Sequence, residues 1–282
     1  TTNARYGSLP QFASLRSMLH RNNIRVMLDA VMDRTATDHS WVKDYPSYYR
    51  RDENGNPVPA GRDSYALDHT GDALRGRMIS YLDFWIEQGV DAFLCAGSAH
   101  VPGDFIQQLR DHFTNEGFDP FLAADGMLPD QVLYGLDALD GEGLYAAFRA
   151  IREGKSDATA IGRTLAEEIR ASSEGTMIIH YAENHTTPRA MKTFGVDDHH
   201  LALFTIFTAP GIPMIHCGEE LNDPPFMELG ERTEINWYDI HWPTYNLISK
   251  LSRFRKNSPV LTNGNLTQIA DTKAVGGFSR RY

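Results

Sequence analysis

Short apolar runs alternate with longer amphipathic segments along most of this 282-residue chain. The apolar runs predict strands at about 24–32, 90–95, 121–124, 131–134, 177–182 and 212–216. The amphipathic segments predict helices at about 8–21, 72–87, 103–113, 143–152, 158–172, 198–207 and 243–256. A repeated strand–helix order is typical of parallel strands joined by helical crossovers. The predicted fold class is therefore α/β, and the length and rhythm favour a barrel over a doubly wound sheet.

Two segments depart from this alternation. Residues 35–68 form an irregular insert that is rich in aromatic side chains and in turn signals. The pattern changes again after Lys256, where 263–282 reads as two β-strands joined by a short turn. We therefore expect a barrel-like domain over 1–257, with the insert at about 35–68, and the beginning of an all-β C-terminal domain over 258–282.

Composition and charge exclude several classes of function. A formal net charge of −10 argues against a nucleic-acid partner, since phosphate binding needs a basic face. No apolar run approaches the roughly 18 residues needed to span a membrane. Cys95 and Cys217 lie in apolar strand-like runs, so we expect buried free thiols rather than a disulfide framework. Thr1 is not a start Met and nothing near it resembles a signal peptide, so we expect the natural N-terminus to be missing.

Five segments carry motifs that occur together in one family. The segment 89–102, Gly-Val-Asp-Ala-Phe-Leu-Cys-Ala-Gly-Ser-Ala-His-Val-Pro, has the frame of a barrel strand that ends in a catalytic residue. The others are 23–35, 183–189 (Glu-Asn-His-Thr-Thr-Pro-Arg), 207–220 and 41–57 within the insert. In this order and spacing they resemble the α-amylase family, glycoside hydrolase family 13, over nearly the whole chain. The resemblance implies an α-amylase-type (β/α)8 TIM barrel and a role in carbohydrate metabolism, and it alone points to a periplasmic or extracellular location.

The resemblance also gives the register of the barrel. By it, the chain begins just before the second barrel helix, so the first two barrel strands are absent. Six strands cannot close an eight-stranded barrel and would leave exposed edges. We therefore expect that the sequence is part of a longer polypeptide, or that another segment or a protein partner supplies the missing strands. The β-domain, which 258–282 only begins, points the same way.

The catalytic carboxylates of the family are the residues that this chain lacks. Retaining glycosidases use two carboxylates about 5–5.5 Å apart, placed at the C-terminal ends of barrel strands. By the resemblance, Ala96 stands where the family has its nucleophile, Thr186 where it has its third acid, and Leu94 where an Arg orients the nucleophile. The acid/base position falls on Ala124 in one register and on Asp125 in another. Leu94 fits the loss of the nucleophile, because an Arg buried without its partner would be costly.

Several polar residues that match the family remain as candidates for substrate binding: Asp29, Asn184 and His185, together with Trp41 of the insert. Structural alternatives stand beside them. Asp29 could brace a loop, His185 could be a hydrogen-bonded strand-end histidine, and the aromatic residues could fasten the insert to the barrel. Asp33 replaces an Asn that often binds calcium in the family, but one carboxylate without companions does not predict a metal site. We expect no metal and no cofactor.

Other ionisable residues have simpler interpretations. Asp125 and Glu183 are the remaining carboxylates near predicted strand ends, and they are weak candidates for displaced acid/base chemistry. His199 and His200 follow two Asp residues, a pattern that favours an N-capped helix with solvated histidines over a metal site. Glu219, which follows the last predicted strand, is expected to be structural.

The rate lost with the missing catalytic groups is large enough to predict the function. General acid–base help contributes about 10²–10⁴-fold, and a nucleophile with its partners about 10⁶-fold. The family mechanism should therefore fall to near background. We expect a pseudoenzyme that binds an α-glucan or another oligosaccharide, or that serves as a structural subunit of an assembly. The alternative is an active glycoside hydrolase or transglycosidase on α-glucans that uses a displaced carboxylate pair. Fold likeness alone does not transfer activity.

Overall fold

The computed structural model describes residues 6–126, 135–172, 175–222, 224–227 and 233–281. It divides into two compact units, residues 1–139 and residues 140–282. The boundary between the units lies inside a strand. Among the described residues, no helix has the length and apolar character that a membrane crossing requires.

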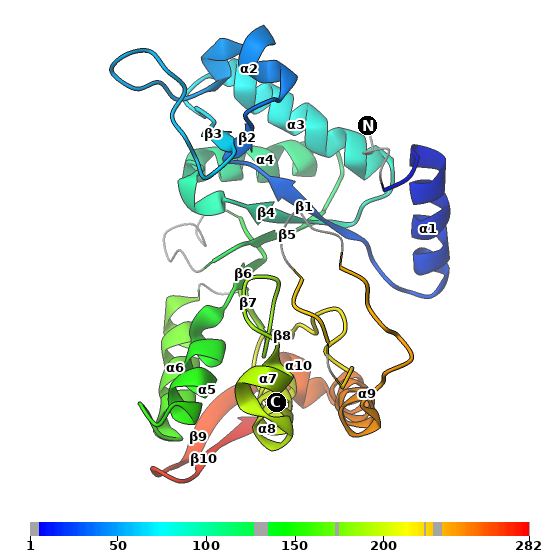
Figure 1. Cartoon of the computed structure of the whole chain (residues 1–282), viewed down its shortest axis with the longest axis vertical. Coiled ribbons are helices and arrows are strands. Elements are labelled where there is room, and N and C mark those ends of the chain that lie inside the picture. The colour runs from blue at the N-terminus through cyan, green and yellow to red at the C-terminus, as the bar shows by residue number, and fades with distance from the viewer. Residues whose placement is uncertain (1–5, 127–134, 173–174, 223, 228–232, 282) are drawn as a thin grey trace. The chain divides into compact units, whose positions relative to one another are not determined.

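Parallel strands form the centre of the first unit: β1 (Met27–Val31), β4 (Ala92–Ala96) and β5 (Phe121–Ala124). β5 also pairs with β6 (Ala138–Asp140), which lies at the unit boundary. The strands are connected by α3 (Asp72–Glu87) and α4 (Gly103–Asn115), and α1 (Leu9–Arg21) precedes β1. Figure 1 shows α3 and α4 together on one side of these strands. The predicted strand at 131–134 lies outside the described residues.

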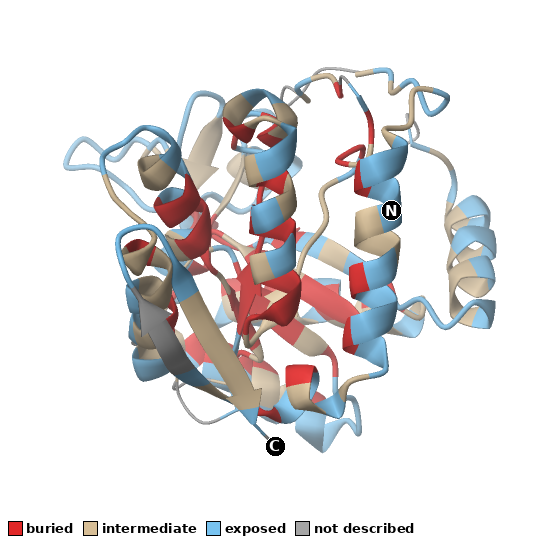
Figure 2. Ribbon diagram, turned by 90° about the horizontal axis from the view of Figure 1, so that it is seen from below, coloured by how far each residue is buried: buried red, intermediate tan, exposed pale blue. Residues whose placement is uncertain are grey.

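The apolar spacing of the sequence explains which helix faces are buried. In α3 the buried side chains are Leu74, Met78, Leu82 and Trp85, which recur at helical spacing along one face. Burying a large apolar side chain contributes roughly 1.5–3 kcal/mol, so this face fixes the helix on the strands. Buried residues are concentrated on the strands and on the helix sides that face them (Figure 2).

The insert is more ordered than the sequence predicts. An antiparallel pair, β2 (Arg34–Ala36) and β3 (Ser64–Ala66), closes it at its base. Between them lie the short helix α2 (Ser40–Asp44) and the 3₁₀ turn η1 (Pro46–Tyr48). A second 3₁₀ turn, η2 (Ser98–His100), follows β4. The turn residues that mark the insert as irregular lie in the loop between η1 and β3.

The second unit contains two short parallel strands, β7 (Met177–His180) and β8 (Ile212–Pro213). Its helices are α5 (Glu142–Arg152), α6 (Thr159–Ala171), α7 (Ala190–Phe194), α8 (Val196–Thr208), α9 (Trp242–Lys256) and α10 (Pro259–Asn263). The predicted hairpin is present as β9 (Asn265–Asp271) and β10 (Gly276–Arg281). Its core includes Leu144, Tyr145, Phe148, Leu165, Phe194 and Ile206. β8 is shorter than predicted because its partner strand ends: Pro213 pairs with His180, the last residue of β7.

Candidate functional site

Strand register decides which residues of the first unit share a face. Asp29 of β1 pairs with Leu94 of β4, and Val31 pairs with Ala96. Partners in adjacent parallel strands point to the same side, so these four residues line one face of the sheet. Ala96 therefore stands on that face with an apolar neighbour on β1 and no charge of its own.

The same register places the two alternatives for the acid/base position on different faces of the sheet. Cys95 pairs with Ala124, and both side chains are buried on the opposite face, which the helices cover. The next residue along the strand direction alternates to the other side. Asp125, and not Ala124, is thus the residue that follows β5 on the face of Ala96.

The carboxylate of Asp125 is already engaged by the loop after β4. The Gly97 N–H donates to its two oxygens at 2.8 and 2.9 Å, and the Ser98 N–H donates to Oδ1 at 3.3 Å. The Ser98 hydroxyl adds a longer contact of 3.4 Å. Asp125 therefore holds the backbone beside Ala96, and these bonds would have to break before it could reach a substrate.

Asp33, which follows β1, forms an ion pair with Arg34, the next residue in the chain. Its side chain is 6% exposed, and Arg34 Nη1 lies 2.9 Å from both carboxylate oxygens. His100 Nδ1 lies 3.3 Å from Oδ2. Gly97 has φ +76, and a Cβ there would lie 2.2 Å from the Asp33 carboxylate. Across the described part of the chain, no group of three or more His, Cys, Asp or Glu side chains could hold a metal ion.

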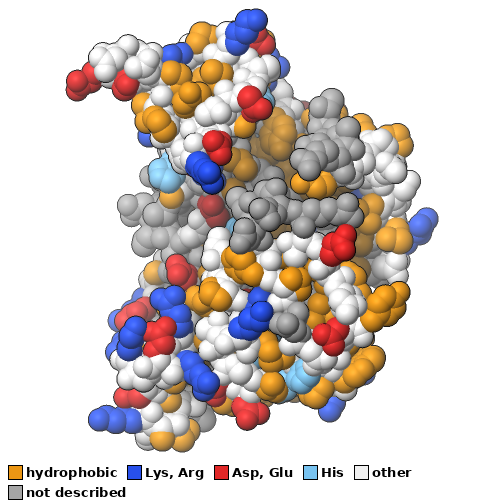
Figure 3. Space-filling model, viewed as in Figure 1, with side chains coloured by type: hydrophobic (Ala, Val, Ile, Leu, Met, Phe, Trp, Pro, Cys, Tyr) orange, Lys and Arg blue, Asp and Glu red, His pale blue; other side chains and the backbone are white. Residues whose placement is uncertain are grey.

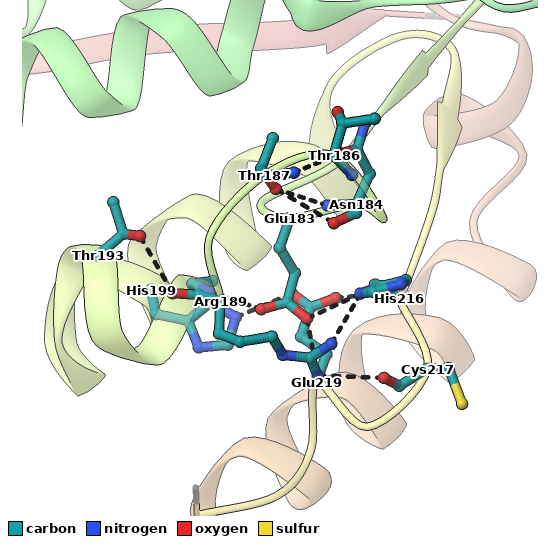
Figure 4. A network of polar contacts seen from close by, with 11 residues as sticks. Glu183, Asn184, Thr186, Thr187, Arg189, Thr193, His199, His216, Cys217 and Glu219 are labelled. Carbon is teal, nitrogen blue, oxygen red and sulfur yellow. Dashed lines mark hydrogen bonds and ion pairs between the residues drawn. The ribbon is translucent and has the colours of Figure 1, made fainter. Parts of the chain in front are cut away.

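In the second unit, Glu183 lies in a buried polar network (Figure 4). Its side chain is 1% exposed and points between Arg189 and His216. Arg189 Nη2 lies 2.9 Å from Oε1, and the Ala190 N–H donates to Oε2 at 2.5 Å. The carboxylate thus joins the end of β7 to the start of α7. Such a carboxylate serves the fold, because both oxygens are occupied and solvent is excluded.

Arg189 connects this carboxylate to the segment after β8. Its Nη1 lies 2.8 Å from His216 Nδ1, and its Nη2 donates to the carbonyl oxygen of Cys217 at 3.1 Å. A guanidinium can only donate, so Nδ1 of His216 must accept and the ring proton must lie on Nε2. The contact of 3.3 Å between Nδ1 and Glu183 Oε1 is therefore not a hydrogen bond from the histidine. Glu183 relies on Arg189 and Ala190.

A second buried pair lies next to this network. His199 Nε2 is 2.9 Å from Glu219 Oε1, and both side chains are fully buried. Glu219 Oε2 also accepts a hydrogen bond from the backbone N–H of His216 at 3.0 Å. Burial raises the pKa of Glu219, and its hydrogen bond from His199 opposes that rise. Glu219 is structural, as the sequence predicts.

The predicted N-capped helix with solvated histidines is wrong. The N-cap of α8 is Gly195, and it has no side-chain cap. His199 faces the interior because Glu219 approaches it there, and His200 Nε2 lies 2.9 Å from the hydroxyl of Thr244. Burial is the largest cause that lowers the pKa of His200. Neither histidine is a surface residue of a solvated helix start.

The loop after Glu183 holds itself together. Asn184 is 5% exposed, and its Oδ1 accepts the N–H of Thr186 at 2.9 Å and the N–H of Thr187 at 3.1 Å. The Thr186 hydroxyl donates to the same oxygen at 2.8 Å. The amide oxygen of Asn184 is therefore used inside a turn. His185, by contrast, is exposed, and so is Thr186.

The remaining sequence candidates lie in the first unit. Trp41 is half-buried and packs edge-on against His39 and Tyr48, with ring centroids 4.9 and 5.5 Å away. Tyr45 stacks on Tyr48 at 5.0 Å, so these rings contact one another within the insert. Asp29 is exposed and lines a groove of about 450 Å³ beside α1. Cys217, which the sequence predicts to be buried, is exposed because the chain has already left β8.

The fold is that of an α-amylase-type (β/α)8 barrel protein. A maltogenic α-amylase from Thermotoga neapolitana superposes with a TM-score of 0.84 over 98% of this chain and 66% of its own, at 26% identity. An α-amylase from Lactobacillus plantarum superposes with a TM-score of 0.87 over 99% of this chain and 70% of its own, at 20% identity.

Sequence relatives agree with the structural neighbours. No protein-family model matches the chain. α-Amylase 3 of Dictyoglomus thermophilum is 26% identical over 86% of this chain and 58% of its own length. A cyclomaltodextrin glucanotransferase of Paenibacillus macerans is 23% identical over 100% of this chain but only 45% of its own length. The resemblance to bacterial α-amylase-like proteins is thus confirmed, and the chain spans about half the length of these relatives.

Proposed function

We propose that this chain is a catalytically degenerate member of the α-amylase family that binds α-glucan without cleaving it. One observation carries the proposal: Asp125 and Glu183, the two candidates for displaced acid/base chemistry, are both committed to the fold. Asp125 holds the Gly97–Ser98 backbone, and Glu183 is buried against Arg189. Ala96 and Thr186 supply no charge in their place.

The chemistry of the family makes this a large loss. A retaining mechanism needs a nucleophile and a proton donor on opposite sides of one glycosidic bond. Ala96 cannot attack the anomeric carbon, and the loss of such a group with its partners reduces rate by about 10⁶-fold. Leu94 is consistent with this loss. Because residue 96 is Ala, an Arg at position 94 would have no carboxylate there to pair with.

Polar groups for binding a sugar remain. His185 is exposed at the tip of a turn that Asn184 orders, so its ring is free to meet a hydroxyl group. Asp29 and Trp41 are the other candidates, and each offers part of its side chain to solvent. A neighbour in fold, a cyclic α-maltosyl-(1→6)-maltose hydrolase from Arthrobacter globiformis, is known in complex with maltose. This supports an α-glucan as the ligand class.

Two measurements on the purified chain test the proposal. Incubation with maltooligosaccharides should release no reducing ends above a buffer blank, while isothermal titration with the same sugars should show saturable heat. Asp125→Asn and Glu183→Gln serve as the matched variants. Turnover that both variants abolish would establish a displaced active site instead. Absence of any saturable heat would leave only a structural role, which also contradicts the proposal.

A further inference from the structure

Two histidines from different elements of the second unit share one buried hydroxyl group. Thr244 lies in the first turn of α9 and is fully buried. Its Oγ1 atom is 2.9 Å from Nε2 of His200, which belongs to α8, and 2.7 Å from Nδ1 of His241, the N-cap of α9. The centroids of the two imidazole rings are 6.2 Å apart. We call these three residues the His–Thr–His cluster, and it connects the first turn of α9 to α8.

The hydrogen bonds of the cluster limit the number of protons that it can hold. A hydroxyl group has one proton, so Thr244 can donate to one imidazole only and must accept from the other. Among the described residues, its hydroxyl oxygen has no third hydrogen-bond partner. The nitrogen that accepts must carry no proton, so that imidazole is neutral. Both hydrogen bonds therefore persist only while at most one of the two histidines is a cation.

A second proton would break this arrangement. Both rings would then donate toward the same oxygen, and the proton of Thr244 would have to turn into the interior without an acceptor, at the cost of a lost hydrogen bond. The two cations would also repel each other across the 6.2 Å between their centroids. Burial is the largest cause that lowers the pKa of His200, and the nearby imidazoles of His199 and His241 act in the same direction.

The charged groups of the surrounding elements leave this proton limit in place. On α8, His199 lies 2.9 Å from Glu219, and both side chains are fully buried. Asp197, in the first turn of α8, favours the charged form of His200, but burial opposes it more strongly. On α9, the cationic side chains lie beyond the first turn and begin at Lys250. Figure 3 shows charged side chains of both signs interspersed over the face of the second unit that is in view, where solvent screens them.

The middle of α9 is held to α8 by apolar contacts, which do not titrate. Leu203 and Phe207 of α8 pack with Leu251 of α9 in one buried cluster. The first turn of α9 has no side-chain cap for its backbone N–H groups. The N–H of its N-cap, His241, donates to the carbonyl oxygen of Glu220 at 2.8 Å. Proton uptake by the His–Thr–His cluster would therefore act on the first turn and leave the rest of the helix in place.

We propose that the His–Thr–His cluster is a pH-sensitive latch, which holds the first turn of α9 on α8 at neutral pH and releases it in mild acid. Such a release is a local opening, with a free energy below that of global unfolding. The open turn lets both histidines bind protons, whereas the closed cluster binds one, so acid favours the open state. With a pKa of about 6.5 for each free imidazole, the ratio of closed to open molecules should fall about tenfold between pH 7.5 and pH 5.0. The latch is independent of α-glucan binding.

Hydrogen exchange of backbone amides, measured by mass spectrometry at pH 7.5 and pH 5.0, tests the latch once the intrinsic effect of pH on exchange is corrected. The peptide of interest contains the Tyr245 N–H, which donates to the His241 carbonyl oxygen at 3.0 Å. In the unaltered chain its protection should fall about tenfold at the lower pH, while a peptide from the second half of α9 keeps its protection. His200→Gln retains a donor and an acceptor but cannot titrate, so it should abolish the fall. Thr244→Ser is the matched control, because it keeps the hydroxyl group and should keep the fall.

Several outcomes would overturn the inference. Equal protection at the two pH values in the unaltered chain would show that the cluster does not release the turn. A fall that persists in His200→Gln would assign it to another group, such as Glu219, whose pKa is raised by burial. An equal loss in the second half of α9 would mean general unfolding instead of a local latch. If circular dichroism shows that His200→Gln does not fold, His241→Gln is the second non-titrating variant, and the same outcomes apply to it.

Discussion

Glu168 Oε2 lies 3.7 Å from His180 Nε2, and both side chains are nearly completely buried. The Nε2–H of His180 is directed at the carbonyl oxygen of Pro210, 3.0 Å away, so it does not satisfy the carboxylate. Among the described residues, neither carboxylate oxygen has a hydrogen-bond partner. Burial, aided by Glu167, raises the pKa of Glu168 to about 7, and burial also lowers the pKa of His180 to about 4.

This pair predicts a specific dependence of stability on pH. The folded pKa of Glu168 lies above its unfolded value, so its contribution is complete below about pH 4.3 and is lost as pH rises through 7. Glu168→Gln has no such loss. Urea unfolding of both proteins should be measured at pH 5 and at pH 8. Between these two pH values, the free energy of unfolding of Glu168→Gln should rise relative to that of the unaltered chain by about 3 kcal/mol.

The titration of His180 does not affect the comparison between the unaltered chain and Glu168→Gln. Its folded pKa lies below the unfolded value, so its contribution is present above about pH 6.5 and is lost as pH falls through 4. The same loss occurs in the unaltered chain and in Glu168→Gln and therefore cancels in their difference. An equal change of stability with pH in both proteins would show that Glu168 is not protonated in the folded state.

Gly97 is predicted to be intolerant of any side chain. It has φ +76, and a Cβ would lie 2.2 Å from the Asp33 carboxylate. Gly97→Ala should lower the free energy of unfolding by about 3 kcal/mol, the sum of backbone strain and forced displacement. Gly117 has φ +77 with open space around its Cβ position. Gly117→Ala therefore isolates the backbone term and should cost about 1 kcal/mol; equal costs would exclude the clash with Asp33.

The pairing of Glu183 with Arg189 can be measured by a double-mutant cycle. Arg189→Met leaves Glu183 charged and buried, which should cost about 3–5 kcal/mol in chemical unfolding. Glu183→Gln combined with Arg189→Met should cost clearly less than the two single changes added together. Additive losses would mean that the two groups do not act as a pair.

The two thiols should differ in reactivity. Cys217 is exposed, while Cys95 is fully buried and burial raises its pKa to about 12. In the native protein a thiol reagent such as Ellman's reagent should label Cys217 and leave Cys95 intact, and unfolding in urea should expose both. Burial also raises the pKa of Cys217, so its labelling should speed up as pH is raised from 7 to 9. Peptide mapping identifies the labelled residue.

Much of the fold follows from the sequence where local pattern and tertiary packing agree. The predicted boundaries of α3 match the structure because four apolar residues at helical spacing select one face. β5 and the hairpin β9–β10 are found where the sequence predicts them. β6 was not predicted at Ala138–Asp140, because a three-residue strand is too short to show any periodicity.

The candidate site was harder to predict because it depends on partners distant in sequence. Nothing local to His199 indicates that Glu219 will meet it in the interior. The choice between Ala124 and Asp125 needed strand register, which the sequence leaves open. Arg189 was visible as the end of a motif, yet its role in neutralising Glu183 depends on the turn between them.

That turn has a consequence for any ligand that reaches His185. The side-chain oxygen of Asn184 already accepts three hydrogen bonds from Thr186 and Thr187, so the loop is ordered without a bound sugar. Association there would be a rigid encounter, with no slow loop closure and no folding heat capacity beyond that of the contact itself. Differences in affinity among oligosaccharides would then arise from their dissociation rates, and not from their association rates.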